Sequence, residues 1–181
     1  MRIIGGKHKG RRFTPPADNW PTRPTTDYAK EGLFNILQNN FDLEELKVLD
    51  LFGGTGNHSY EFASRGCCDI TYVDRFAGAI KFVRGMVEKL DMVDCIKIVQ
   101  ADVFKYIRRA KGKQYDYIFL GPPYGMPALD TLPDEVFEAD LLAPGGWMVL
   151  EHNPNHDFTK HPRFDEARNY GKTIFSFFDH G

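Results

Sequence analysis

Residues 47–57 read Lys47-Val48-Leu49-Asp50-Leu51-Phe52-Gly53-Gly54-Thr55-Gly56-Asn57, a short apolar run with one acid that leads into a turn with three glycines. The apolar run is typical of a strand buried on both faces, and the glycines let the backbone turn sharply and present N–H groups to a ligand. Asn57 is the predicted N-cap of the next helix, and Gly66 is its predicted end. The following strand, Ile70–Asp74, places an acid about 20 residues beyond the turn, where a carboxylate can accept two ribose hydroxyls. This unit predicts a nucleoside-cofactor site.

Two classes of cofactor compete for this turn. A dinucleotide site calls for a third glycine three residues after Gly56, and this chain has Ser59 there. Asp50 would repel a pyrophosphate but would suit an ammonium group. S-adenosylmethionine carries an ammonium, has no phosphate and has a ribose for Asp74, so these residues favour it over NAD. The remaining alternative is a turn that binds no ligand.

The composition is that of an ordinary globular protein, with 181 residues of which 42% are hydrophobic and 27% are charged. This length favours one domain, and no apolar run reaches the roughly 18 residues that a membrane span needs. The basic N-terminus lacks the apolar stretch of a secretory signal. The cysteines, Cys67, Cys68 and Cys95, have no metal-ligand spacing, and their odd number favours reduced thiols and a cytoplasmic location. No metal site is predicted.

The basic residues are concentrated at the start of the chain. Residues 1–30 contain seven Lys or Arg against two Asp, a charge of +5, so the other 151 residues carry −7 of the total of −2. Such a basic segment is typical of a protein that binds a polyanion, although it can also serve solubility alone. Two extended runs, 2–4 and 11–13, flank a glycine-rich basic turn and predict a β-hairpin. Residues 14–24 contain four prolines and predict an extended connector.

The rest of the chain alternates between helical and strand patterns. Thr26 or Asp27 is expected to cap a helix with an apolar face, and Ala79 to Leu90 repeat at helical spacing. Further predicted elements are the strands 96–99, 117–120, 147–150 and 173–178 and a helix over 103–109. This order predicts an α/β, doubly wound, mostly parallel sheet with ligands beyond the carboxyl ends of the strands. Asp102 and Val103 are placed there to bracket an adenine ring, and Asp102 can also cap the helix.

A second motif, Gly121-Pro122-Pro123-Tyr124, follows the strand 117–120 directly. Two prolines make a rigid turn, and a flat aromatic ring beside them can stack on a planar base or amide. Methylation of an exocyclic amine needs these parts, because carbonyl acceptors must hold its N–H bonds while the lone pair faces the methyl donor. Catalysis would consist mainly of positioning and acceptor electrostatics, without a metal or a covalent nucleophile. The alternative is a proline-rich turn with no chemical role.

The chain resembles the bacterial 16S ribosomal RNA (guanine-N2)-methyltransferase family, the one that modifies guanine 966. The resemblance extends from end to end. The matching pieces are Arg2-Ile3-Ile4-Gly5-Gly6, Arg23-Pro24-Thr25-Thr26-Asp27, Leu33-Phe34-Asn35, Asp50-Leu51-Phe52-Gly53-Gly54-Thr55-Gly56 and Pro122-Pro123-Tyr124. It implies a Rossmann-like class I methyltransferase fold with a seven-stranded sheet and an N-terminal β-hairpin, S-adenosyl-L-methionine as cofactor, and small-subunit ribosomal RNA or a 30S assembly particle as partner. Residues 1–24 would be the basic hairpin and connector, and residues 25–181 the methyltransferase domain, acting as a monomer.

The resemblance also assigns site residues. The predicted catalytic turn is Gly121, Pro122, Pro123 and Tyr124. The predicted cofactor-binding residues are Thr25, Asp50, Phe52, Gly53, Gly54, Thr55, Gly56, Asn57, Asp74, Arg75, Asp102 and Val103. The predicted RNA-binding residues are Arg2, Lys7, Lys9, Arg11, Arg12 and Arg23.

One position departs from the family pattern, which has Asp or Asn where this chain has Gly121. The missing side chain is one of the two acceptors expected to hold the amine. A binding protein without turnover is therefore an alternative from another functional class. Within the enzyme class, DNA adenine and protein glutamine amide methyltransferases also use Pro-Pro-Tyr turns; the basic segment and the absence of a large target-recognition domain argue against both. His58, at a helix start beside the glycine turn, is expected at the surface, and contact with a ligand is the alternative.

Overall fold

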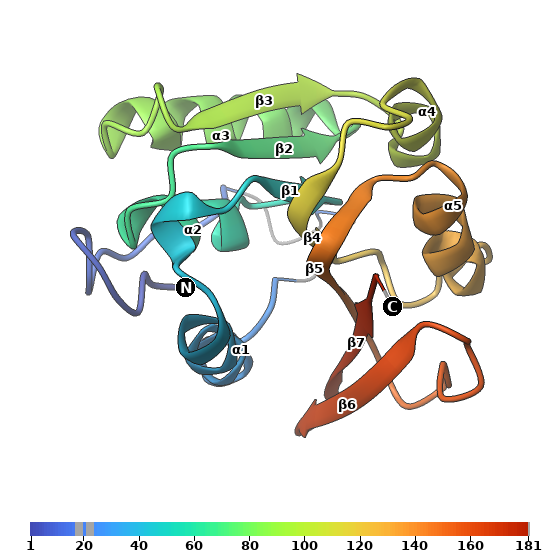
Figure 1. The fold of residues 1–181 in the computed structure, drawn as a ribbon. Helices are drawn as coiled ribbons and strands as arrows, with labels where there is room; N and C mark the ends of the chain where they lie inside the picture. The colour runs from blue at the N-terminus through green and yellow to red at the C-terminus, as the bar shows by residue number, and fades with distance from the viewer. Residues whose placement is uncertain (17–19, 21–23, 181) are drawn as a thin grey trace.

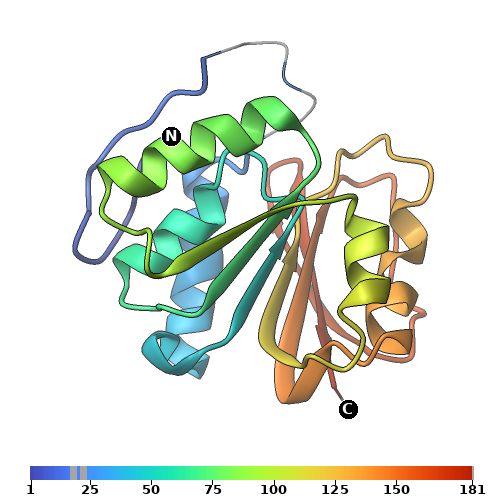
Figure 2. The ribbon, with the colours of Figure 1, turned by 90° about the horizontal axis from the view of Figure 1, so that it is seen from above.

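The structure, a computed structural model, describes residues 1–16, 20 and 24–180. Within these residues, seven strands form one sheet in the order β3-β2-β1-β4-β5-β7-β6 (Figures 1 and 2). The strands β1 to β5 run parallel, and β7 is antiparallel to both β5 and β6. The predicted doubly wound, mostly parallel seven-stranded sheet is confirmed. The strands are Val48–Leu51 (β1), Ile70–Asp74 (β2), Ile96–Gln100 (β3), Tyr115–Leu120 (β4), Leu142–His152 (β5), Phe164–Tyr170 (β6) and Thr173–Asp179 (β7).

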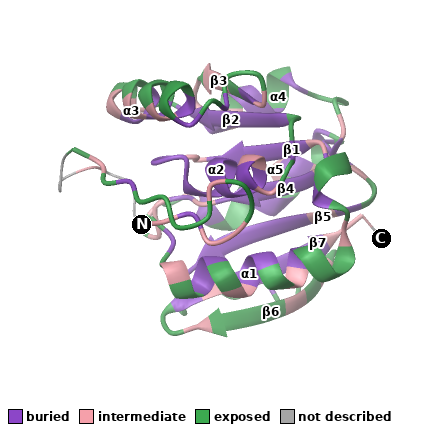
Figure 3. Cartoon of the chain, turned by 90° about the vertical axis from the view of Figure 1, so that its left-hand side faces the viewer, coloured by how far each residue is buried: buried purple, intermediate pink, exposed green. Residues whose placement is uncertain are grey.

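Helices cover both faces of the sheet (Figure 2). On one face, α1, α2 and α3 enclose a core with the side chains of Val48, Tyr72 and Phe119. On the other face, α4 and α5 enclose a second core with Leu49 and Leu120. The central strands are buried on both sides (Figure 3), which explains their nearly continuous apolar sequences. The α-helices are Asp27–Asn40 (α1), Asn57–Ser64 (α2), Ala77–Lys89 (α3), Val103–Arg109 (α4) and Leu132–Glu138 (α5), with 3₁₀ turns at Leu43–Glu45 and Leu129–Thr131.

The helix caps agree with the sequence in part. Thr26 caps α1 by accepting the N–H of Ala29 at 3.2 Å. Gly66, at φ +99°, follows the end of α2 as predicted. Asn57 is not the N-cap of α2: Gly56 holds that position at φ +83°, and Asn57 is the first helical residue. A left-handed glycine there frees the Asn57 side chain for other contacts.

The predicted N-terminal β-hairpin is wrong, because residues 1–13 form no pair of strands. Residues 1–13 contain one isolated bridge, between Arg2 and Arg12, and no strand. Three backbone hydrogen bonds still close the segment, among them Ile3 N–H to the carbonyl of Arg11 at 2.9 Å. Ile3 and Phe13 are buried in the core with α1 and α2. The segment, hereafter the arm (residues 1–13), is thus a strap packed on the domain. Part of the predicted connector, 17–19 and 21–23, lies outside the described residues.

Several backbone groups of the arm bind α2. The N–H groups of Ile4 and Gly5 donate to the Glu61 carboxylate at 2.9 Å each. The N–H of Lys7 donates to the carbonyl of Ser64 at 2.7 Å. A charged acceptor makes stronger hydrogen bonds than a neutral carbonyl, so Glu61 fixes this part of the arm on the helix, and pairing within the arm is limited to the bridge between Arg2 and Arg12.

The expectation of reduced thiols is wrong for two of the three cysteines. Cys68 and Cys95, 27 residues apart, form a disulfide. They precede β2 and β3, which are neighbours in the sheet, so their side chains meet at its amino-terminal edge. Cys67 is free and buried, and burial raises the pKa of its thiol to about 11.

Two elements, β6 and α5, were not predicted. β6 is an edge strand of mostly exposed polar residues, so it lacks an apolar alternation. α5 has only seven residues, with Pro133 in its first turn, and is too short to show a helical repeat.

Candidate active site

The glycine turn lies beyond the carboxyl end of β1, beside the ends of β2 and β4. Phe52 opens it in the left-handed region, at φ +57°, a conformation that non-glycine residues rarely hold outside functional sites. A Cβ atom on Gly53 would lie 2.3 Å from the Tyr72 ring, and one on Gly56 would lie 2.4 Å from the Tyr60 ring. Packing against the two tyrosines therefore requires glycine at both positions.

A cavity of about 420 Å³ opens next to this turn, in the size range of small-ligand sites. It brings together predicted cofactor-binding residues and one residue of the predicted catalytic turn. The residues that line the cavity, whether they were predicted or not, are Phe52, Asp74, Arg75, Phe76, Asp102, Val103, Phe104, Pro123, Gly125 and Met126. The predicted residues that come from the ends of β1, β2, β3 and β4 thus converge on one cavity, hereafter the large cavity.

Asp74 is buried at the edge of the large cavity. Its Oδ2 accepts the N–H of Gly54 and its Oδ1 accepts the N–H of Phe76, both at 2.9 Å. Each carboxylate oxygen has two lone pairs, so a ligand hydroxyl can also bind to each oxygen. The backbone bonds fix the orientation of the carboxylate in advance.

Asp102 performs the capping role that the sequence predicted. Its carboxylate accepts the N–H of Lys105 at 3.1 Å and thereby caps α4. Arg75 approaches it with 3.9 Å between Nη1 and Oδ2, on a side chain that is 80% exposed. Val103 is buried beside them. Contact with an adenine ring stays a prediction for these residues.

A second, small cavity of about 30 Å³ lies on the other side of Phe52. This volume is enough for roughly one water molecule. It is lined by most of the other predicted cofactor residues together with Gly121, which directly precedes Pro122-Pro123-Tyr124. Its lining residues are Pro24, Thr25, Asp50, Phe52, Gly53, Gly54, Thr55, Asn57, His58, Phe119, Gly121 and Glu151.

Asp50 is a buried carboxylate in the small cavity. Burial raises its pKa to about 7, and the nearby charge of Asp74 acts in the same direction. A hydrogen bond from the Ser59 hydroxyl to Oδ2, at 2.7 Å, opposes this shift. Asp50 therefore titrates near neutrality, and a cation bound next to it would favour its ionised form.

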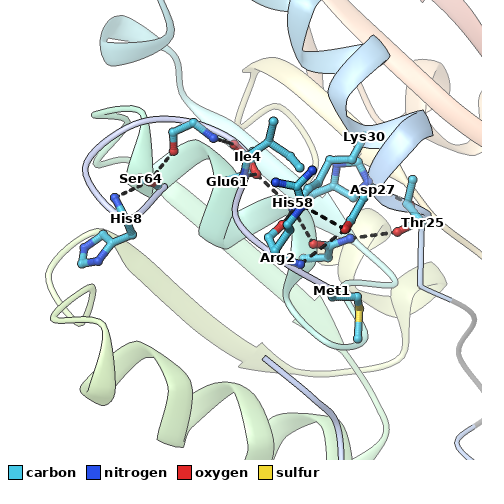
Figure 4. Close-up of polar contacts among 12 residues, drawn as sticks. Met1, Arg2, Ile4, His8, Thr25, Asp27, Lys30, His58, Glu61 and Ser64 are labelled. Carbon is cyan, nitrogen blue, oxygen red and sulfur yellow. Dashed lines mark hydrogen bonds and ion pairs between the residues drawn. The ribbon is translucent and has the colours of Figure 1, made fainter. Parts of the chain in front are cut away.

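Thr25 connects two other groups of the small cavity. Its hydroxyl donates to Oε1 of Glu151. The same hydroxyl lies 3.1 Å from Nε2 of His58 (Figure 4). Since the threonine proton goes to Glu151, Nε2 of His58 carries a proton and donates to Thr25. The other ring nitrogen, Nδ1, is buried without a hydrogen-bond partner among the described residues. Burial and the charge of Lys30 keep the pKa of His58 well below its ordinary value, so the ring is neutral.

The Pro-Pro-Tyr motif lies between the two cavities. Gly121 lines the small cavity and Pro123 the large one, while Pro122 is buried. The Tyr124 hydroxyl donates to Oε2 of Glu151 at 2.7 Å. The carbonyl of Tyr124 accepts from Nε2 of His156 at 3.0 Å, which holds the turn against the loop after β5.

A buried cluster of Lys30, Asn57 and Glu61 lies next to the small cavity, which Asn57 lines. The Lys30 ammonium donates to the carbonyl of Arg2 at 2.6 Å and to Oδ1 of Asn57 at 2.7 Å, and it lies 3.0 Å from Oε1 of Glu61 (Figure 4). Asn57 in turn donates to the carbonyl of Thr25 at 3.1 Å. The arm, α1 and α2 are therefore joined at one buried ammonium.

The predicted RNA-binding residues are separate from both cavities. Lys7, Lys9, Arg11 and Arg12 are exposed on the arm. Arg2 pairs with Asp27, with 3.3 Å between Nε and Oδ2. Arg23 lies outside the described residues.

Four residues that line the small cavity were not among the predicted site residues: Pro24, His58, Phe119 and Glu151. Glu151 directly follows the predicted strand run 147–150, much as Asp74 ends the run 70–74, and that repeated pattern could have revealed it. His58 was expected at the surface but is only 5% exposed, because its ring stacks on Phe119 with 3.6 Å between ring centroids. Phe119 gave no signal beyond that of a core residue.

No helix in the described part of the chain is long and apolar enough to cross a membrane. Among the same residues, no group of three or more His, Cys, Asp or Glu side chains could hold a metal ion.

Comparison with known proteins decides the family. Residues 1–179 match the family described as "Conserved hypothetical protein 95". The chain belongs to this family. It is 34% identical over 155 residues to "Putative rRNA methyltransferase YlbH" of Bacillus subtilis, which covers 84% of this chain and 83% of that protein. The Conserved hypothetical protein 95 family is one of S-adenosylmethionine-dependent methyltransferases, so the resemblance given by the sequence motifs is confirmed at this level.

Two further relatives support the assignment to the Conserved hypothetical protein 95 family. "Ribosomal RNA small subunit methyltransferase D" of Buchnera aphidicola is 32% identical over 124 residues, which are 68% of this chain and 61% of that protein. The solved structure of a hypothetical protein from Thermus thermophilus is similar with a TM-score of 0.86 at 26% identity, over 99% of each chain.

Proposed function

We propose that this chain transfers a methyl group from S-adenosylmethionine to the exocyclic N2 of a guanine in small-subunit ribosomal RNA. Its family membership and the names of its relatives support the reaction class and the RNA substrate. The observation that carries the proposal is the position of the Pro-Pro-Tyr turn. One end of that turn lines the large cavity, the other lines the small cavity, and Phe52 is shared by both. A methyl group held between the cavities would lie beside the turn.

The residues fit the cofactor in two parts. In the large cavity, Asp74 would accept the ribose hydroxyls, and Asp102 with Val103 would hold the adenine, with Phe52 and Arg75 at its border. The ammonium of the methionine part is about the size of the small cavity, and Asp50 would pair with it there. The residues that would surround this part are Thr25, Gly53, Gly54, Thr55, Gly56 and Asn57. The cofactor supplies an activated methyl group, and the chain supplies positioning and hydrogen-bond acceptors.

The guanine would bind at the turn. The Tyr124 ring would stack on the base, and the carbonyl of Pro122 would accept one N–H of the amine, with Pro123 making the turn rigid. Mass spectrometry of small-subunit RNA from cells with and without this gene tests the proposal. Loss of one N2-methylguanosine in the deletion strain is expected, and an unchanged RNA would contradict it. Gly121 favours a second candidate, an RNA-binding protein without turnover, which predicts that unchanged RNA.

The pKa of Asp50 predicts a pH dependence of cofactor binding. The ordinary pKa of 3.8 is raised to about 7 by burial, so the carboxylate that pairs with the ammonium forms only as the pH rises through 7. The affinity for S-adenosylmethionine should increase roughly tenfold between pH 6 and pH 7.5. Calorimetry at several pH values measures this change. In Asp50→Asn the affinity should be weaker and nearly independent of pH, and a parent protein with the same flat profile would contradict the role of Asp50.

The arm predicts a salt dependence of RNA binding. Replacing Lys7, Lys9, Arg11 and Arg12 by glutamine removes four exposed charges, and the slope of log affinity against log salt should fall by up to about 3. Truncation is a poorer test, because Ile3, Phe13 and the backbone of the arm support the core.

The control replaces four exposed lysines elsewhere, at Lys97, Lys111, Lys113 and Lys172. It makes the same change in net charge and should leave most of the slope intact. Equal losses in the two variants would show that only the total charge matters and would contradict an RNA-binding arm.

A further inference from the structure

Gly121 and Glu151 occupy matching positions on neighbouring strands. β4 pairs with β5 in parallel, with Leu120 opposite Leu150, so Gly121 and Glu151 are the next pair at the carboxyl ends. Neighbouring strands are about 4.8 Å apart, and side chains at paired positions point to the same face. Both residues line the small cavity. A carboxylate is thus present one strand away from the position where the family pattern has Asp or Asn.

Hydrogen bonds fix the orientation of the Glu151 carboxylate. Oε1 accepts the hydroxyl of Thr25, which accepts from Nε2 of His58, and Oε2 accepts the hydroxyl of Tyr124 at 2.7 Å. Glu151 is only 3% exposed. A carboxylate offers about four acceptor positions, so it can accept from an amine as well as from these hydroxyls. A base stacked on the Tyr124 ring would be in van der Waals contact with that ring, whose hydroxyl already donates to Glu151.

The Phe119 ring occupies space that a side chain at position 121 would need. A Cβ atom on Gly121 would lie 3.0 Å from Cε2 of Phe119, and the Phe119 ring is itself stacked on His58. The aromatic pair fills the space next to the backbone of Gly121. Glycine at this position leaves that stack undisturbed, while Glu151 approaches the cavity from the next strand.

We propose that Glu151 is the second acceptor for the target amine, in place of the side chain that Gly121 lacks. This inference rests on the proposed function. The lone pair of N2 attacks the methyl carbon, an N–C bond forms, and the C–S bond breaks with its electron pair left on sulfur. Glu151 accepts one N–H bond of the amine and takes its proton as positive charge develops on nitrogen, and the proton then passes to water. The products are N2-methylguanine, S-adenosylhomocysteine and a proton.

The test measures methyl transfer to 30S particles by the parent and by Glu151→Gln. The variant keeps the size of the side chain and loses the charge, and kcat should fall on the order of a hundredfold. The affinity for S-adenosylmethionine and the melting temperature should change little. An active parent with an equally active Glu151→Gln variant would overturn this inference and leave the proposed function intact. A parent that methylates no guanine would overturn both.

Rescue separates an acceptor from a merely structural residue. Adding Gly121→Asp to Glu151→Gln returns a carboxylate to the neighbouring strand, and kcat should recover at least tenfold. The matched control adds Gly121→Ala, which introduces the same Cβ contact with Phe119 without an acceptor, and it should give no recovery. If Glu151 only holds Thr25 and Tyr124 in place, Asp at position 121 will restore nothing, and that result would overturn the inference. Melting curves of both double variants confirm that each is folded at the assay temperature.

Discussion

Replacement of Lys30 by methionine is expected to lower the free energy of unfolding by about 3–5 kcal/mol. The Lys30 side chain is fully buried, and its ammonium lies 3.0 Å from Glu61. Burial lowers the pKa of Lys30, although the charge of Glu61 partly offsets the effect. Methionine would leave Glu61 buried with less compensation and would leave the carbonyl of Arg2 without its donor. Chemical denaturation of the parent and the variant measures the difference.

Two further variants separate the effect of the buried charge from that of losing any ion pair. Arg108→Met removes an exposed ion pair with Glu135, 2.9 Å long, and should leave the free energy of unfolding nearly unchanged, because solvent screens exposed ion pairs. The double variant Lys30→Met/Glu61→Gln removes both buried charges and should be less destabilised than the sum of its single variants. A loss below about 1 kcal/mol in Lys30→Met would show that the buried cluster does not hold the arm to the domain.

Asp74→Ala is expected to weaken S-adenosylmethionine binding by about 1.5–3 kcal/mol, or roughly 10- to 150-fold. The ribose hydroxyls would lose a charged acceptor, and the N–H groups of Gly54 and Phe76 would lose the group that orders the glycine turn. S-adenosylhomocysteine contains the same ribose, so its affinity should fall by the same factor. Titration calorimetry with both ligands measures the two losses.

The control for Asp74 is an exposed carboxylate at the opposite edge of the sheet. Asp94→Ala removes the same charge from the protein near the disulfide between Cys68 and Cys95 and should leave cofactor affinity unchanged. If Asp74→Ala binds both ligands as well as the parent does, the large cavity does not hold the nucleoside.

The elements with a strong local pattern could be predicted from the sequence. The strand Ile70–Asp74 and the helix Val103–Arg109 have the predicted bounds, because each has a clear apolar pattern and a recognisable end. The arm was mispredicted because its form depends on Glu61, a residue far away in the sequence that accepts hydrogen bonds from its backbone. Local patterns contain no information about such a partner.

The candidate site was predictable where acids lie at or near the carboxyl end of a predicted strand. Asp50, Asp74 and Asp102 were found in this way, and the structure brings them to one edge of the sheet. Glu151 was missed because its importance comes from its pairing with Gly121 across two strands whose adjacency the sequence does not state. His58 was missed because its burial depends on a ring, Phe119, in another strand. Side chains that act through tertiary neighbours need the fold to be seen.

Methyl transfer to N2 of guanine can be measured directly on 30S particles. Purified protein is incubated with 30S particles from a strain that lacks this gene and with S-adenosylmethionine that carries a deuterated methyl group. The RNA is then digested and analysed by mass spectrometry. The account predicts one labelled N2-methylguanosine per particle, and none with Asp74→Ala at a cofactor concentration far below its dissociation constant. Label in another nucleoside, or no label with a parent protein that binds the cofactor, would contradict it.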